Sequence, residues 1–151
     1  MQKENPSVEQ NYRILMIIWS ALFMTQFMFF ALIYFARPEL YQFDFSRPVL
    51  DENAPIILVF AVFAISNLAL SLFLSKRFID RAIDEQKIAL CQTAMILGCA
   101  LTESISLIGI FLAFAFSYQY FFAWIVLGII GMVLHFPQRD NIYKASFSDR
   151  S

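Results

Sequence analysis

The sequence predicts an all-α fold, an integral membrane four-helix bundle that forms a single domain over residues 1–151. Of the 151 residues, 60% are hydrophobic and only 15% are charged, whereas a soluble domain has about 25% charged residues. Four apolar runs have the length that crosses the hydrocarbon core of a bilayer, which takes roughly 20 helical residues. Lysine and arginine are concentrated in segments that four spans would place on one side of the membrane.

Prolines mark the ends of these apolar runs. Pro38 closes the first run, because proline cannot continue the helical hydrogen-bond ladder and restricts the residue before it. Pro55 suits the first turn of the second helix, where its missing N–H is not needed. Pro137 closes the fourth run, and we expect a polar tail from there to Ser151. The expected spans are residues 12–36, 54–75, 88–116 and 119–136.

Two connecting segments have compositions that predict their structure. Residues 39–53 combine aromatic and acidic side chains, which suits an ordered loop at the level of the lipid headgroups. Residues 75–87 place apolar residues, beginning with Phe78 and Ile79, at helical spacing among charges. We therefore expect the second helix to continue past the membrane as an amphipathic extension.

The basic residues predict the orientation. Four spans place the N-terminus, residues 76–87 and the C-terminal tail on one side of the membrane. Nine of the 11 Lys and Arg residues lie there, and the other two, Arg37 and Arg47, lie in residues 37–53. The positive-inside rule makes the richer side cytoplasmic, so we expect a multi-pass protein of the cell inner (plasma) membrane with both termini in the cytoplasm. The nine are Lys3, Arg13, Lys76, Arg77, Arg81, Lys87, Arg139, Lys144 and Arg150.

Glu103 is the ionisable residue that lies deepest in an apolar run. A carboxylate at the centre of a bilayer is costly, so it is usually turned toward protein, protonated or used in function. Small residues recur along the same predicted helix, which is typical of a close contact with another helix. Glu103 lies at the edge of this stripe, and we expect it to face a helix. The stripe comprises Ala94, Gly98, Thr102 and Ser106, and is extended by Gly109 and Ala113.

Polar side chains of other helices are candidate partners for Glu103. At about 1.5 Å per residue, Gln26 lies at a depth comparable with Glu103, and Asn67 is shallower. We expect the carboxyl group to carry its proton and to donate a hydrogen bond to Gln26 or Ser106. The candidate ion-binding or polar-clamp residues are Glu103, Ser104, Ser106, Thr102, Gln26 and Asn67.

The sequence Gly98-x-Ala100-Leu101-x-Glu103-Ser104 resembles the ion-carrying helix of the proteolipid (c) subunit of rotary ATP synthases. In that family, a carboxylate in the middle of the membrane binds a proton or a sodium ion. The resemblance implies that Glu103 is an ion-binding carboxylate and that Ser104 supplies a supporting hydroxyl. As a whole, the chain is similar to four-span membrane proteins of bacteria.

Other classes of site are not indicated by the sequence. A net charge of −1 does not give the concentrated positive field that nucleic-acid binding requires. His135 is the single histidine, so it cannot provide both axial ligands of a haem, and we expect it at the membrane interface. Cys91 and Cys99 lie about two helical turns apart, too far for a disulfide. We find no metal-ligand cluster, nucleophile–base pair or phosphate loop, and expect neither an enzyme nor a cofactor.

Two functions remain open from the sequence. In the first, the protein is a small non-enzymatic component of the membrane, a homo-oligomer or a part of a complex with other membrane subunits, and Glu103 is a buried polar clamp. In the second, it is a channel or carrier for protons or cations such as sodium, and Glu103 binds the ion. A clamp would be closed against a neighbouring side chain, whereas a carrier needs a polar route or an open groove.

Overall fold

The computed structural model describes residues 6–42, 44, 46, 48–50 and 53–146. These residues form helices and contain no strand, as the sequence predicts. Four segments of this part are long and apolar enough to cross a membrane: Val8–Ala36, Ala54–Asp84, Ile88–Phe116 and Phe121–Ser146. The elements are α1 (Pro6–Ala36), η1 (Pro38–Tyr41), α2 (Ala54–Asp84), α3 (Ile88–Phe116), α4 (Phe121–Leu134) and α5 (Arg139–Ser146).

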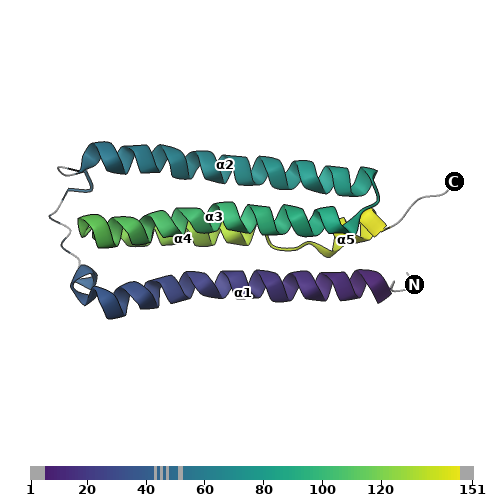
Figure 1. The fold of residues 1–151 in the computed structure, drawn as a ribbon, viewed down its shortest axis with the longest axis horizontal. Coiled ribbons are helices and arrows are strands. Elements are labelled where there is room, and N and C mark those ends of the chain that lie inside the picture. Colours follow the sequence, from purple (N-terminus) through teal and green to yellow (C-terminus); the bar gives the residue numbers. More distant parts are fainter. Residues whose placement is uncertain (1–5, 43, 45, 47, 51–52, 147–151) are drawn as a thin grey trace.

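The third helix is the centre of the bundle. Figure 1 shows α1, α2 and α3 running side by side, with α4 along α3, and with the start of α1 and α5 at the same end of the bundle. α3 contacts α1, α2, α4 and α5. In α3, 50% of the most apolar stretch is buried, compared with 11% in α1 and 17% in α2. Side chains on α3 are therefore the ones best placed to join several helices.

Short turns connect the helices at two points. Gln86, between α2 and α3, and Ser117, at the end of α3, both have positive φ, with values of 54° and 51°. The left-handed conformation at Ser117 reverses the chain, and the N–H of Tyr118 bonds to the carbonyl of Leu112 at 3.2 Å. Such a left-handed residue is a common way to end a helix. α3 has the bounds that its apolar run predicts.

In the predicted polar tail after Pro137, residues 139–146 form a helix, α5, which the sequence did not lead us to expect. Ile142 and Ala145 face inward with 1% and 0% of their surface exposed, so this short amphipathic helix is held by packing. Arg139 also forms an ion pair with Glu9 of α1 at 2.8 Å. Eight residues are too few for a helix that is stable alone, which explains why composition does not reveal it.

Other boundaries differ from the expected ones by smaller amounts. α1 begins at Pro6, ahead of the predicted span, since proline is favoured in the first turn of a helix. α4 ends at Leu134, slightly earlier than predicted. α2 continues to Asp84, as the amphipathic pattern predicts. The loop of residues 39–53 begins within the short helix η1. Positions 43, 45, 47, 51 and 52 of this loop lie outside the described residues.

Candidate functional site

Glu103 lies on the outward side of α3. The exposed residues Ile96, Ala100, Leu107 and Phe114 of this helix are four or seven positions apart, so they lie on one side of it. Glu103 falls in the same series and is half-buried. We call these five residues the outer stripe of α3. The carboxylate therefore lies near the middle of the helix, at the edge between the bundle and its surroundings.

Thr25 on α1 is the hydrogen-bond partner that the structure gives to Glu103. Its Oγ1 lies 2.8 Å from Oε1 of Glu103 and 2.6 Å from the carbonyl oxygen of Leu22. A threonine hydroxyl has one proton, so it can donate to only one of these acceptors at a time. When that proton goes to Leu22, the contact with Glu103 is a hydrogen bond only if the carboxyl group carries a proton of its own.

The predicted pairing of Glu103 with Gln26 or Ser106 is wrong, because these two residues bond to each other. Ser106 donates to Oε1 of Gln26 at 2.5 Å, and both side chains have 0% of their surface exposed. Consecutive residues on a helix point about 100° apart, so Thr25 reaches the outer edge of α3 while Gln26 reaches its interior. Nε2 of Gln26 has no hydrogen-bond partner among the described residues.

The other predicted polar residues lie on the far side of α3 or bond within it. Asn67 on α2 donates from Nδ2 to Oγ of Ser104 at 2.9 Å, so it pairs with the neighbour of Glu103 instead of Glu103 itself. Thr102 is fully buried, and its hydroxyl contacts the carbonyl oxygens of Gly98 and Cys99 in its own helix. Glu103 and Ser104 thus link α3 to α1 on one side and to α2 on the other.

The small-residue stripe of α3 lies against α4. Ala94, Gly98, Thr102, Ser106, Gly109 and Ala113 are all buried. A Cβ added at Gly98 would overlap the ring of His135, and one added at Gly128 of α4 would overlap Oγ of Ser106. The glycines therefore allow these two helices to approach more closely than any larger residue would permit. His135 itself is buried, with Nδ1 lying 2.7 Å from the carbonyl oxygen of Gly131.

Several polar contacts between α1 and the rest of the bundle are not predictable from the sequence. The indole Nε1 of Trp19 donates to the carbonyl oxygen of Met132 at 3.0 Å. Near the other end of α1, Nη2 of Arg37 donates to Oγ of Ser117 at 2.7 Å. With the Thr25 and Gln26 contacts and the ion pair between Glu9 and Arg139, they attach α1 along most of its length. Thr25 lies next to Gln26 in an apolar run and, like Gln26, is recognisable in the sequence as a polar residue of that run.

Two hollows of the described structure lie away from Glu103. A cavity of about 70 Å³ lies near α5, and its lining includes Cys91, His135 and Asn141 but not Glu103. A second hollow, at the opposite end, is lined by Arg37, Ser117 and Gln119 among others. Within the described part of the chain, no three His, Cys, Asp or Glu side chains are grouped to hold a metal ion.

The arrangement at Glu103 can act in two ways chemically. It can join helices by hydrogen bonds, or it can present a half-buried carboxyl group to something outside the bundle. Comparison of the chain with protein-family models, with curated proteins and with solved structures gave no match.

Proposed function

We propose that this protein is a non-enzymatic structural component of the inner membrane, and that the outer stripe of α3 is the surface through which it associates with a second copy. The observation that carries the proposal is the position of Glu103, half-buried within a stripe of otherwise apolar exposed residues. Lipid chains offer no hydrogen bonds, so a polar group that faces them is destabilised. A second helix placed over Glu103 would remove that cost.

The chemistry of the stripe favours a second copy as the partner. Ala100, one turn from Glu103, is small enough for the backbones of two helices to approach closely. A two-fold axis along the membrane normal keeps each residue at its own depth, so Glu103 of one protomer would meet the same residue of its partner. Two carboxyl groups can share a hydrogen bond when one of them is protonated. The sequence has no Lys or Arg in residues 14–36, 54–75 and 88–116. A second copy would therefore bring no positively charged side chain to the depth of Glu103.

Inside each protomer, Glu103 would act as a clamp. Its contact with Thr25 holds α1, which is otherwise the helix with the least buried apolar stretch. Interhelical hydrogen bonds in membrane proteins contribute about 0.6 kcal/mol each on average. One such bond contributes little free energy. It is nevertheless important for the attachment of α1, because this helix has few buried apolar side chains.

Transport of a proton or a sodium ion through Glu103 is the second candidate function. Two observations favour it: the carboxyl group is only half-buried, and Nε2 of the nearby Gln26 has no partner among the described residues. The proteolipid resemblance points to the same role for Glu103. The closed contact with Thr25 and the distant cavities favour the structural function instead.

Cysteine cross-linking tests the proposed association. Ala100→Cys places a thiol in the outer stripe, and Ala69→Cys places one at an exposed position of α2. Ala69 is about as far from the start of α2 as Ala100 is from the end of α3. The native Cys91 and Cys99 are buried and give little background. Oxidation in native membranes should form a disulfide-linked dimer with Ala100→Cys and much less with Ala69→Cys. Equal, low yields at both positions would overturn the proposal of a second copy at this stripe.

A further inference from the structure

The end of α2 extends beyond the part of the helix that the hydrocarbon core can contain. Its apolar run, which has no charged residue, ends at Leu74, yet the helix continues to Asp84, about 15 Å further at about 1.5 Å per residue. The headgroup region on each side of a bilayer is only about 5–8 Å deep. The first turns after Leu74 therefore lie at the level of the lipid headgroups.

A shallow hollow of about 180 Å³ lies on this part of α2. Its lining consists of Leu74, Arg77, Phe78 and Arg81. The two arginines are four positions apart and so lie one above the other on the same face of the helix. Two guanidinium groups thus lie beside two apolar side chains at the level where lipid changes from acyl chain to headgroup.

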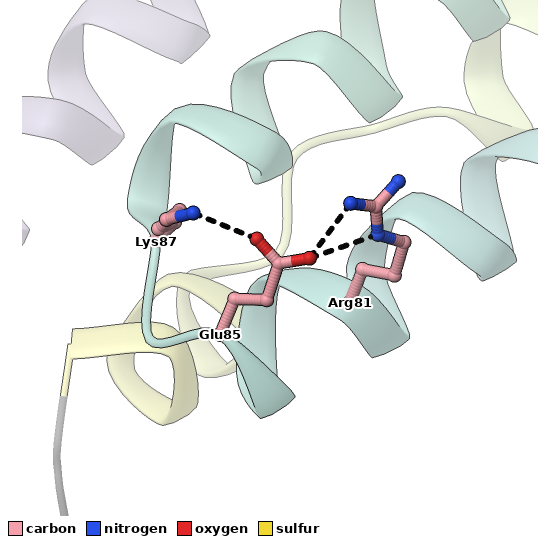
Figure 2. Close-up of polar contacts among 3 residues, drawn as sticks. All are labelled: Arg81, Glu85 and Lys87. Carbon is pink, nitrogen blue, oxygen red and sulfur yellow. Dashed lines mark hydrogen bonds and ion pairs between the residues drawn. The ribbon is translucent and has the colours of Figure 1, made fainter.

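Arg81 is held in place by its neighbours. Its Nε and Nη2 donate to Oε1 of Glu85 at 3.0 and 2.7 Å, and Nζ of Lys87 lies 2.9 Å from Oε2 of the same carboxylate. Figure 2 shows this arrangement, in which Nη1 of Arg81 makes no contact with the other two residues. Arg77 is exposed, and the described residues give it no ion pair.

We propose that this hollow binds the phosphate of an anionic phospholipid. Arginine is suited to this role because its planar guanidinium group donates two parallel hydrogen bonds to phosphate oxygens. Leu74 and Phe78 would contact the first carbons of the acyl chains, and the exposed Leu70 and Phe73 continue the same apolar surface into the bilayer. The lipid would join the arginines on one side to the lipid-facing surface of α2 on the other.

The apolar half of the lining argues for a lipid instead of a free anion. A soluble phosphate would use only the arginines and would gain nothing from Leu74 or Phe78. Asp80 and Asp84 belong to the same extension but do not line the hollow. The four basic and three acidic residues of positions 76–87 nearly balance, so binding would depend on where the arginines lie and not on the net charge of the segment.

The test is a lipid titration of the purified full-length protein in a neutral detergent, followed by thermal unfolding. Phosphatidylglycerol should stabilise the protein more than phosphatidylcholine does, because a ligand of the folded state raises its stability. Arg77→Gln should raise the apparent Kd for phosphatidylglycerol about tenfold, the ratio for about 1.5 kcal/mol from a hydrogen bond to a charged group. Lys76→Gln is the matched control, since it removes the same charge about 100° away around the helix, and should leave that Kd unchanged.

Inorganic phosphate tests whether the hollow binds a free phosphate ion or the phosphate of a phospholipid. It should give little protection, and Phe78→Ser should weaken the effect of phosphatidylglycerol although both arginines remain. Equal effects of the two lipids, equal effects of Arg77→Gln and Lys76→Gln, or full protection by inorganic phosphate would each overturn the proposal of a phospholipid site.

Discussion

Oγ1 of Thr25 on α1 and Oε1 of Glu103 on α3 lie 2.8 Å apart near the middle of their helices, and neither side chain is fully buried. The contact joins the most exposed helix of the bundle to its central helix at its outer edge. Further inside the same interface, Gln26 and Ser106 make a second contact that is completely buried. Adjacent positions on α1 thus serve the outside and the inside of the same interface.

Thr25→Val should destabilise the bundle by about 0.6–1.7 kcal/mol, the range measured for interhelical hydrogen bonds in a membrane protein. The change keeps the shape of the side chain and removes the hydroxyl. Thr93→Val is the control, because Thr93 is exposed and bonds only to the carbonyl of Ala89 in its own helix. Unfolding in mixed micelles measures both variants, and equal free energies of unfolding would show that the Thr25 contact does not stabilise the fold.

Gly98→Leu should cost about 1–3 kcal/mol of overpacking strain. The new side chain would have to displace the buried ring of His135 or separate α3 from the end of α4. Phe29→Leu, a change in a partly exposed side chain of α1, and Ala115→Leu, at an exposed position of α3, should cost much less. The same unfolding assay compares the three variants. If Gly98→Leu were tolerated as well as Ala115→Leu, the small-residue stripe would not be a close interface.

The ion pairs at the turn between α2 and α3 should weaken in acid. Hydrogen bonds from Lys87 and Arg81 lower the pKa of Glu85 from 4.5 to about 2. A carboxyl whose pKa is lower in the folded state adds stability above the unfolded value of 4.5, and this contribution is lost as the pH falls toward 2. The protection factor of the Lys87 amide, which bonds to the carbonyl of Ala82 at 3.0 Å, should therefore fall over this pH range.

In Glu85→Gln, the same amide should have a lower protection factor that does not change between these pH values. A wild-type protection factor that is constant from pH 5 to pH 2 would contradict a stabilising role for the carboxylate.

Cysteine labelling tests the predicted orientation. In intact cells, an impermeant maleimide should react with a cysteine at Ser46, in the loop of residues 37–53, and should not react with one at Asp84, next to the turn between α2 and α3. Both native positions are exposed. Reaction at Asp84→Cys alone would reverse the orientation and place both termini outside.

The sequence predicts the four long helices because apolar runs of spanning length leave few other structures possible in a bilayer. It also places the extension of α2 and the full length of α3 correctly. The short helix α5 is not predictable, because it is held by the packing of Ile142 and Ala145 against the bundle and not by its own length or composition.

The pairing of polar residues depends on rotation of each helix about its axis, which depth alone does not give. Counting residues correctly puts Gln26 at the level of Glu103, but the rotation of α1 turns Thr25 to Glu103 and Gln26 to Ser106. A shift of one residue, about 100° around the helix, decides which partner is reached. For the same reason, the partial exposure of Glu103 could not be read from its place in an apolar run.

Substitution of Glu103 tests the central claim most directly. Glu103→Gln keeps the shape and the hydrogen-bonding capacity of the side chain but cannot bind or release a proton, whereas Glu103→Ala removes both. The proposed structural function predicts that Glu103→Gln forms the same cross-linked dimer through Ala100→Cys as the wild type, that Glu103→Ala forms less, and that proton or sodium flux in proteoliposomes is the same in all three. A flux that is present in the wild type and lost in a fully assembled Glu103→Gln protein would contradict this account and establish Glu103 as an ion-carrying residue.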